Sequence, residues 1–524
     1  MKLRTIVKIA ITSSVVLLCS GFALYSFFRL SAAEGQKDFN LYELVPSTTS
    51  AVFVTDDVLE FVAEVDDLAC SKNQQYLYVS KLFSYLKQSL YALSEDTPHG
   101  LSRQMNQMLI SFHEPDNERN QVLYCRLGNG DKELVNRFVR KYISSLYPPK
   151  TFIYKGEEII IYPMADGDFL ACYLTSDFMA LSFQKKLIEN VIDAYKSGKS
   201  LADDSTFTGI RAPKKSAAAA TIYTRMQGMM GWTEFDMKMK DDFIYFSGIT
   251  HDADTCFAFI NQLRQQQSVK GFPGEVLPST AFYFSRQGIT DWVSLLSYGN
   301  AQGQSVPART SEVQNRDKEF SRYLMENAGQ DLVACLFQRE DTLQGAAAVL
   351  SLSVADVTEA ERMLRALVNA ASADEGRRNP RITFCYTVNK AYPIYRLPQT
   401  TLFEQLTSFA EPTLDVYAAF YGGRLLLAPD ADALAHYIRQ LDKGEVLNGA
   451  MVYQTGMDHL SDSYHFMLMA DFDHIFQQSE NHVRFVPDFF LRNADFFRHF
   501  TLFVQFACAD GVVYPNIVLK YKSE

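Results

Sequence analysis

The chain is poor in tryptophan and has no closely spaced cysteines. Of its 524 residues, two are Trp and eight are Cys, and no two cysteines form a C-x-x-C pair. This scatter excludes the common zinc ribbons and redox dithiols. Cys125 and Cys172 lie inside apolar runs, where we expect buried thiols that pack as small core residues. One or two disulfides stay open as an alternative in an oxidising compartment.

Basic residues are also scarce. The chain has 50 Lys and Arg against 61 Asp and Glu, a formal net charge of −11, whereas a polyanion partner needs clustered positive charge. We therefore expect no nucleic acid partner. A hydrophobic share of 47% with 21% charged residues predicts a globular chain with a large core. The aromatic residues, 39 Phe and 28 Tyr, favour packing on sheets.

Known catalytic and cofactor motifs are missing as well. The sequence contains no G-x-S-x-G elbow, P-loop, H-E-x-x-H motif, EF-hand loop or dinucleotide fingerprint. It therefore predicts no catalytic residue, no metal ligand and no cofactor. The best candidates for chemistry are Asp471, Asp473 and His474, since carboxylates and imidazoles can ligate a metal. Further histidines lie nearby, namely His459, His465, His482 and His499.

Asp471 also has a simpler interpretation. It follows an apolar run at 464–469 that predicts a strand, and it precedes a short run with helical spacing. An Asp at that position typically accepts hydrogen bonds from the free amides of the first helical turn. We therefore expect Asp471 to cap a helix, with the metal site as the alternative.

Residues 9–28 are uncharged and predominantly apolar. A helix of that length just crosses a hydrocarbon core ~30 Å thick. Lys2, Arg4 and Lys8 precede the segment and Arg29 follows it, which favours a cytoplasmic N-terminus. We predict a single-pass signal-anchor in the inner membrane, with the bulk of the chain on the periplasmic side.

A cleavable signal peptide is the alternative for the same segment. The apolar core of a signal peptide is usually about 7 to 15 residues long, which is shorter than this one. Ser31-Ala32-Ala33 nevertheless supplies small residues at a plausible cleavage site. Without cleavage, residues 1–8 form a cytoplasmic tail and residues 29–40 form a tether. Both interpretations place the rest of the chain outside the cytoplasm.

The chain contains a diverged internal repeat. Leu44-Val45-Pro46-Ser47-Thr48 recurs as Val276-Leu277-Pro278-Ser279-Thr280, an offset of 232. Residues 169–225 align with 415–471 at an offset of 246, and an offset of 225 aligns 122–127 with 347–352. Ordered matches with small shifts at loops are typical of duplicated modules. We predict modules at 41–264 and 276–524, joined by a linker at 265–275.

Hydrophobic periodicity predicts the fold class. Short apolar runs separated by Gly, Asp and Asn turns favour antiparallel strands, and residues 76–93 have the spacing of an amphipathic helix. The stretch 299–317 is rich in Gln, Ser and Gly, and we expect an exposed loop there. The prediction is an α+β fold: two tandem, similar modules of mainly antiparallel sheet with packed helices, behind one transmembrane helix.

The opening of the first module resembles a known family. The phrase Leu44-Val45-Pro46-Ser47-Thr48-Thr49-Ser50-Ala51-Val52-Phe53 follows an N-terminal membrane segment, and the segment 178–201 contains a helix followed by Gly198 and Leu201. These features resemble a family of exported bacterial proteins, the uncharacterised "domain of unknown function 3352". The resemblance implies a location in the cell envelope and no known activity.

These observations favour a non-enzymatic function. We expect a membrane-anchored envelope protein that acts as a binding or assembly module, whose partner is an envelope protein, a lipid or a peptide. The alternative is an envelope hydrolase or metal-dependent enzyme that uses Asp471, Asp473 and His474.

Overall fold

One antiparallel sheet runs through the protein from end to end. The computed structural model describes residues 39–73, 105–114, 119–128, 131–138, 147–164, 167–211, 218–225, 231–250, 258–292, 295, 311–339, 345–374, 382–388, 390–407, 414–478, 486 and 488–522. Within them, 20 strands join one sheet, and a two-stranded sheet stands apart. The predicted α+β class with a mainly antiparallel sheet is confirmed.

The first half of the chain forms one half of this sheet. Its strands follow one another from the outer edge to the centre of the sheet in this order: β4 (Lys150–Tyr154), β5 (Glu157–Pro163), β6 (Phe169–Leu174), β7 (Phe178–Ser182), β3 (Gln121–Arg126), β2 (Met108–Phe112), β1 (Ala51–Thr55), β8 (Ala220–Thr224), β9 (Thr233–Lys240) and β10 (Phe243–Thr250).

The second half of the chain forms the other half of the sheet. From the opposite edge to the centre its strands are β15 (Ile382–Tyr386), β16 (Ala391–Arg396), β17 (Tyr417–Tyr421), β18 (Arg424–Ala428), β14 (Ala346–Val354), β13 (Ala328–Gln338), β12 (Ala281–Gly288), β20 (Phe466–Asp471), β21 (Phe500–Ala509) and β22 (Val512–Tyr521). When the ten strands of each half are numbered along the chain, both halves have the same spatial order from the outer edge to the centre.

The two halves meet at the pair β10–β22. Ile244 pairs with Leu519 and Ser247 with Asn516 in antiparallel register. Each of these strands is the second arm of a hairpin, and each hairpin turns at an aspartate with positive φ, Asp241 (52°) and Asp510 (50°). A backbone ladder therefore continues the sheet without a break from one half to the other.

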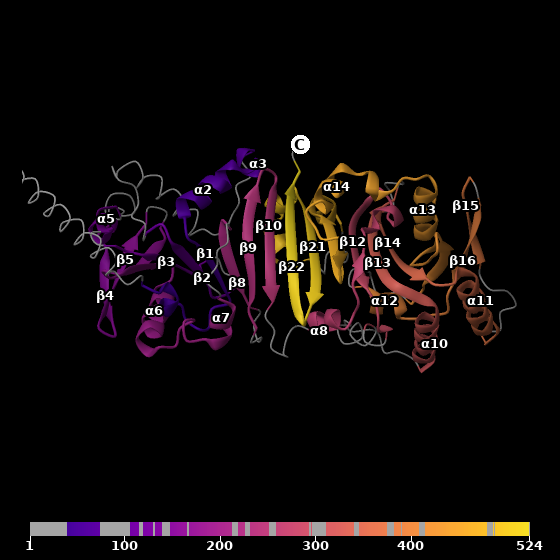
Figure 1. The fold of residues 1–524 in the computed structure, drawn as a ribbon, viewed down its shortest axis with the longest axis horizontal. Helices are drawn as coiled ribbons and strands as arrows, with labels where there is room; N and C mark the ends of the chain where they lie inside the picture. The colour runs from indigo at the N-terminus through magenta and orange to yellow at the C-terminus, as the bar shows by residue number, and fades with distance from the viewer. Residues whose placement is uncertain are drawn as a thin grey trace, which may run out of the picture.

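Helices cover the sheet in a matching way in each half. Figure 1 places α6 below the strands at one end and α13 above them at the other, with α2 and α10 in the opposite positions. The helices are α2 (Val58–Asp67), α3 (Ala69–Lys72), α5 (Asp131–Phe138), α6 (Lys185–Ser197), α7 (Ser205–Ile210), α8 (Ala258–Arg264), α10 (Ser311–Asn327), α11 (Val357–Asp374), α12 (Leu402–Leu406), α13 (Ala431–Asp442), α14 (Met451–Met457), α15 (Phe472–Phe476), α17 (Asp488–Arg492) and α18 (Ala494–Phe497).

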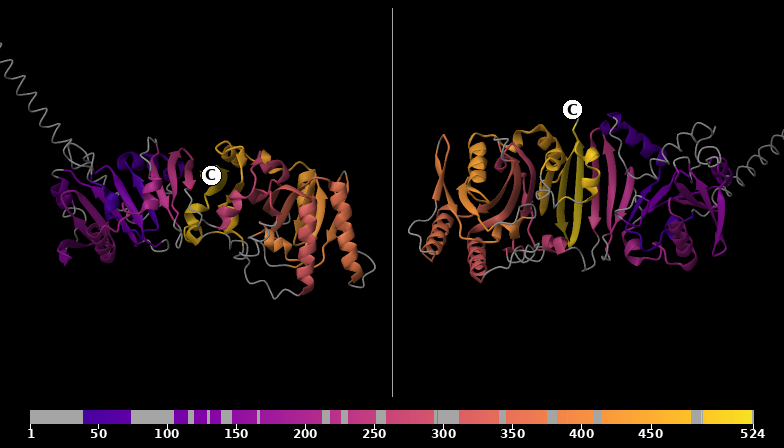
Figure 2. Two further views of the ribbon diagram at one scale, coloured as in Figure 1. Left: turned by 60° about the horizontal axis from the view of Figure 1, so that its bottom comes forward. Right: turned by 180° about the vertical axis from the view of Figure 1, so that it is seen from behind.

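The hydrophobic core follows from this arrangement. The face under α6 has its own cluster, which includes Ile188, and the face under α13 has another, which includes Ile438. The opposite face has one cluster that reaches from Phe53 to Leu350 through the junction residues Ile244 and Leu519. Figure 2 shows α10 and α11 side by side on the second half. Burial of side chains across the junction stabilises the two halves as one body.

The entry motif of each half makes the same contacts. The Leu201 N–H donates to the Val45 carbonyl at 2.8 Å, and the Leu447 N–H donates to the Leu277 carbonyl at 2.9 Å. In the first half this bond ties the 3-10 turn η1 (Leu41–Leu44) to the chain after α6. In the second half it ties η3 (Pro273–Val276) to η4 (Leu447–Gly449), which follows α13.

A glycine with positive φ lies just after each of these two helices. Gly198 ends α6 with φ 63°, and Gly444 follows α13 with φ 76°. Only glycine adopts this left-handed conformation without steric cost.

The stretch 265–275, predicted as a linker, contains regular structure. It holds β11 (Val269–Lys270), which pairs with β19 (Ser463–Tyr464), and the start of η3. Phe272 stacks on Tyr464 with ring centroids 6.2 Å apart. The two halves are therefore joined by packed chain.

The cysteines of the described residues are free thiols. Five are buried and Cys508 is half-buried, and no disulfide occurs among them. Burial raises the pKa of Cys125 to about 12 and that of Cys172 to about 12. The prediction that these two thiols pack in the core is confirmed.

Two predictions stay untested and a third is wrong in part. The segment 9–28 and the helix at 76–93 lie outside the described residues. Within the described residues, no helix has the length and apolarity to cross a membrane. The predicted loop at 299–317 is wrong from Ser311 onward, where α10 begins. Asp317 is buried in that helix and accepts hydrogen bonds from the Thr400 and Thr401 hydroxyls, each at 2.7 Å.

Candidate functional site

Asp471 lies at the end of β20 and begins α15. Its carboxylate accepts the Asp473 N–H at 3.1 Å, contacts His474 Nδ1 at 3.3 Å and accepts a hydrogen bond from Lys522 Nζ at 2.6 Å. Burial raises the pKa of Asp471, but the donors from His474 and Lys522 outweigh it and the net pKa is lowered. The prediction that Asp471 caps a helix is confirmed.

The remaining histidines do not gather around this carboxylate. His465 Nδ1 accepts the Cys508 N–H at 3.1 Å, His459 Nε2 lies 3.2 Å from the Tyr245 hydroxyl, and the His499 ring lies beside Tyr521. His482 lies outside the described residues. Within the described ranges, no three His, Cys, Asp or Glu side chains are grouped as a metal site requires.

The contact between Asp471 and His474 predicts a measurable pH dependence. The hydrogen bond that His474 Nδ1 donates to the Asp471 carboxylate raises the pKa of His474. The protonated His474 ring stabilises the folded state fully below the usual His pKa of about 6.5, and this contribution is lost as the pH rises through the raised pKa of His474. The ionised Asp471 carboxylate makes its contribution above the usual Asp pKa, and that contribution is lost as the pH falls through the lowered pKa of Asp471. The contact is therefore strongest between about pH 4 and 6.5. In Asp471→Asn, the NMR titration of His474 is expected to move to lower pH, and an unchanged titration would contradict the assignment.

A serine and a histidine meet at the end of β2. Ser111 Oγ lies 2.9 Å from His113 Nε2 and 3.1 Å from the Tyr124 hydroxyl. A nucleophilic serine must reach its substrate, but the Ser111 side chain is fully buried. Burial also lowers the pKa of His113 to about 4. The group has the contacts of a structural hydrogen-bond network.

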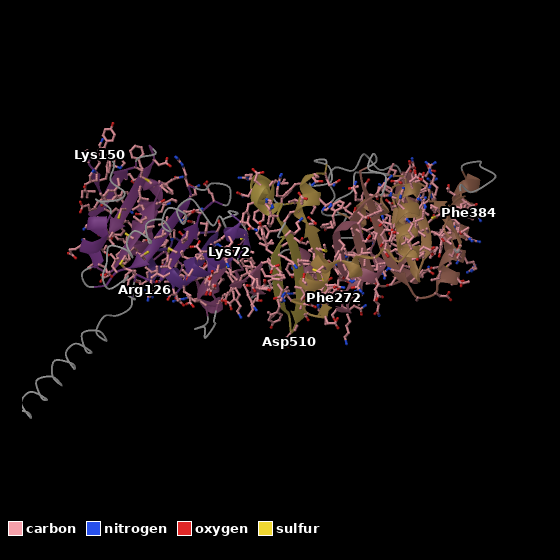
Figure 3. The ribbon with its side chains drawn as sticks, turned by 90° about the horizontal axis from the view of Figure 1, so that it is seen from above. Lys72, Arg126, Lys150, Phe272, Phe384 and Asp510 are labelled. Carbon is pink, nitrogen blue, oxygen red and sulfur yellow. The ribbon has the colours of Figure 1, made fainter. Side chains whose placement is uncertain are left out.

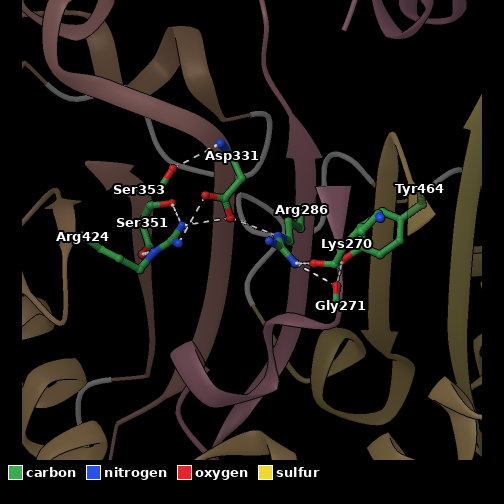
Figure 4. Close-up of polar contacts among 8 residues, drawn as sticks. All are labelled: Lys270, Gly271, Arg286, Asp331, Ser351, Ser353, Arg424 and Tyr464. Atoms are coloured by element: carbon green, nitrogen blue, oxygen red, sulfur yellow. Dashed lines mark hydrogen bonds and ion pairs between the residues drawn. The ribbon is translucent and has the colours of Figure 1, made fainter. Parts of the chain in front are cut away.

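A larger buried network links four strands of the second half (Figure 4). Asp331 on β13 accepts from Arg286 Nε on β12 at 3.0 Å and from Arg424 Nη1 and Nη2 on β18 at 3.3 Å each. Arg286 Nη1 also donates to the Gly271 carbonyl at 2.8 Å, and the Tyr464 hydroxyl donates to that same carbonyl at 2.8 Å. The network thereby anchors the chain next to β11.

The charges in this network are mutually compensated. Burial raises the pKa of the Asp331 carboxyl, but Arg424 and the other donors lower it by more than burial raises it. The net pKa is therefore lowered. Arg424 also donates to Ser351 Oγ on β14 at 2.5 Å and to the Ser351 carbonyl at 2.9 Å. Its guanidinium is thus engaged on both sides. These contacts indicate a structural element.

Among the described residues of the second half, a row of large apolar side chains stands exposed on the outermost strand. Ile382, Phe384, Tyr386 and Val388 are 38%, 50%, 73% and 98% exposed. We call these four residues the β15 stripe. They alternate along β15 and the turn after it, and residues two apart in a strand point to the same side. Large apolar side chains in such a row on a monomer mark a binding surface.

The backbone of β15 is open on its outer side. Among the described strands it pairs only with β16. The Thr387 N–H donates to the Lys390 carbonyl at 3.0 Å at the hairpin turn. Every second residue before Thr387, namely Cys385 and Thr383, therefore directs its backbone N–H and C=O groups to β16. The residues between them, Phe384 and Tyr386, therefore direct their N–H and C=O groups to the free edge.

Comparison with known proteins adds no relative. No protein-family model, curated protein or solved structure matches the chain. The function must therefore be argued from the site alone.

Sequence reasoning missed both the β15 stripe and the network around Asp331. The stripe had a local signal, since Ile382, Phe384, Tyr386 and Val388 alternate with Thr383, Cys385 and Thr387. That pattern predicts a strand but not which of its faces lies open. The network had none, because its charged residues lie 45 and 93 positions apart along the chain.

Proposed function

We propose that the protein is a membrane-anchored protein of the bacterial cell envelope that binds a partner without catalysis, on the free edge of β15. The β15 stripe carries this proposal. An open strand edge with apolar side chains at alternate positions has the properties that strand addition by an extended polypeptide uses. Main-chain hydrogen bonds would supply affinity, and Phe384 and Tyr386 would supply specificity.

The envelope location rests on residues 9–28 and on the resemblance to the exported family. We propose that this segment is an uncleaved anchor and that the modules lie on the periplasmic side of the inner membrane. Protease treatment of intact and of lysed spheroplasts tests the orientation. Sequencing of the mature N-terminus tests cleavage, because a mature chain beginning at Glu34 would remove the anchor.

We also infer that the two halves are tandem modules that arose by duplication. The shared strand order supports this, as do two isolated bridges, Pro46 with Ser200 and Pro278 with Val446. The members of these bridges are related by the sequence offsets of 232 and 246. Superposition of 41–250 on 275–521 in an experimental structure tests the inference, since a lack of correspondence would contradict it.

The enzyme alternative at Asp471, Asp473 and His474 has less support. The Asp471 carboxylate is engaged by a helix amide, His474 and Lys522, which leaves it poorly placed for a metal or a substrate. Metal analysis of Asp473→Ala/His474→Ala tests this hypothesis directly.

Photo-crosslinking tests the binding surface. A crosslinking amino acid at position 384 or 386 of the full chain, in living cells, is expected to capture one protein, and mass spectrometry locates the captured segment. A synthetic peptide of that segment should bind the purified chain, and Phe384→Asp should weaken binding at least ~tenfold because burial of one large apolar side chain contributes about 1.5–3 kcal/mol. Met451, which is 77% exposed away from the edge, provides the control in Met451→Asp.

Backbone methylation of the peptide separates strand addition from simple apolar contact. In strand addition alternate N–H groups of the peptide face β15. N-methylation of one alternate set should abolish binding, and methylation of the other set should preserve it. Equal effects of both sets, or equal binding by wild type and Phe384→Asp, would overturn the proposed site.

A further inference from the structure

We propose that the opposite end of the sheet, at β4, rests against the surface of an anionic lipid bilayer. This inference rests on the proposed anchor and names the surface that the anchored chain contacts. Four large apolar side chains stand exposed at that end, and we call them the β4 patch: Tyr147, Phe152, Ile153 and Phe169, which are 71%, 42%, 70% and 57% exposed. Figure 3 shows Lys150 of β4 and Phe384 of β15 at opposite ends of the molecule.

The β4 patch places large apolar side chains on a sheet edge. Natural edges are protected by charge, proline or a covering segment, and apolar residues exposed together mark contact with a protein or a membrane. Phe152 and Ile153 are neighbours in β4 and therefore point to opposite faces of the sheet. Together they present apolar surface on both sides of the edge, which suits insertion of that edge into an interface better than one-sided docking.

Lysines surround the patch. They are Lys150, Lys155, Lys185 and Lys186. The Lys185 ammonium lies 5.1 Å from the centre of the Phe152 ring, and Lys150 is exposed with no ion pair to any described residue. Two carboxylates offset part of this charge: Asp193 pairs with Lys155 at 2.6 Å, and Glu189 pairs with both Lys185 and Lys186, at 2.7 and 3.4 Å.

Lysine and tyrosine next to apolar side chains match the chemistry of a bilayer interface. Tyrosine favours the headgroup level, and each lysine close to an anionic leaflet gains about 1 kcal/mol. The apolar side chains can enter the boundary between headgroups and acyl chains. The net charge of −11 would keep most of the protein away from such a surface, so contact is expected at this end.

The position of the N-terminal part of the chain selects the bilayer over a peptide. Phe39, the first described residue, packs on Phe178 and Tyr195 with ring centroids 4.8 and 5.9 Å apart. Tyr195 lies on α6, and the Lys196 ammonium on the same helix donates to the Lys155 carbonyl at 2.7 Å. The chain therefore enters the fold beside the β4–β5 hairpin.

The tether is short compared with the sheet. Residues 29–38 connect the predicted anchor to Phe39 and reach at most about 35 Å when extended. The 20 strands of the sheet, spaced about 4.8 Å apart, separate its two edges by roughly 90 Å. The β4 patch is thus within reach of the membrane that holds the anchor, whereas the β15 stripe stands far from it.

Depth-dependent quenching tests this geometry in the full chain. The protein is reconstituted into vesicles of phosphatidylcholine with phosphatidylglycerol, with an environment-sensitive fluorescent amino acid at position 153 or at position 386. Brominated lipids should quench the probe at 153 severalfold more than the probe at 386. Vesicles of phosphatidylcholine alone, and the variant Lys150→Glu/Lys186→Glu, should each reduce quenching at 153.

Flotation of the vesicles separates the two proposals. A chain that fails to float with vesicles after carbonate washing lacks the anchor, and this outcome overturns the proposed membrane attachment. A chain that floats but shows equal quenching at 153 and 386 keeps the anchor and overturns the β4 contact. Crosslinking of position 153 to a soluble protein, with no quenching there by brominated lipids, would also overturn it, in favour of a protein-binding edge.

Discussion

Replacing Asp331 with alanine is expected to lower the free energy of unfolding by about 3–5 kcal/mol. The change removes the carboxylate that Arg286 and Arg424 share, and it leaves two guanidinium groups with little exposure and no counter-charge. Removal of one partner from a buried ion network usually costs more than replacement of the whole network. Urea unfolding followed by circular dichroism measures the loss. A loss below about 1 kcal/mol would show that solvent reaches these guanidiniums.

Two variants control this experiment. Asp458→Ala removes an exposed carboxylate from the second half and should change stability by less than ~0.5 kcal/mol. Asp331→Leu combined with Arg286→Met and Arg424→Met replaces the network by apolar side chains, and we expect it to recover most of the loss. If the triple variant is as unstable as Asp331→Ala, the effect comes from packing rather than from unpaired charge.

Gly288→Ala is expected to destabilise the protein by about 3 kcal/mol. A Cβ atom at this position would lie 2.0 Å from the Gln267 carbonyl oxygen, and a backbone atom cannot rotate away as a side chain can. The Gly288 N–H also donates to the His465 carbonyl at 3.0 Å, so movement of Gly288 disturbs the contact between β12 and the chain that leads into β20. Thermal unfolding and hydrogen exchange at Val269 and Tyr464 measure the effect.

The matched control makes the same chemical change where space is open. Gly209 lies inside α7, and a Cβ there would meet nothing within 4 Å. Gly209→Ala should therefore stabilise the protein by about 0.5–1 kcal/mol, because alanine loses less conformational entropy on folding. Equal effects of the two variants would refute the steric argument at Gly288.

Alignment of the two halves of the chain predicted many of the strands, because corresponding strands in the two halves repeat their apolar pattern. The offset of 246 also matches the structure in register: Leu181 pairs with Leu123, and its equivalent Leu427 pairs with Leu350. The offset of 225 placed Ala348 on Leu123, two residues from the observed partner. Side chains on one face of a strand recur every two residues. An alignment that is shifted by two residues therefore keeps the apolar pattern, and only the observed strand pairing shows the shift.

The α10 error has a different physical origin. Residues 311–317 are polar except for Val313, which resembles a loop when they are considered alone. The helix is stabilised by tertiary contacts further along, where Phe320 and Leu324 are buried, and by Asp317 with its two threonine partners. Such contacts join residues more than 80 positions apart, and no local pattern reports them.

The candidate site was predictable only where its chemistry was local. The capping role of Asp471 depends on its immediate neighbours, so residue order was sufficient. The Arg286–Asp331–Arg424 network depends on strand neighbours. The first half has Val54 and Phe178 at the positions of the two arginines, given the offsets of 232 and 246. The two halves therefore share a strand order but differ in the side chains that fill these positions.

The order in which the strands are made matters for folding. Phe243 in β10 pairs with Lys520 in β22, so during synthesis β10 has no neighbour on that side until nearly the whole second half has followed it. Unpaired edges attract other chains. A chain of this topology must therefore keep its inner edge from aggregating while the later strands emerge, and on the proposed route out of the cytoplasm a chaperone would meet that need.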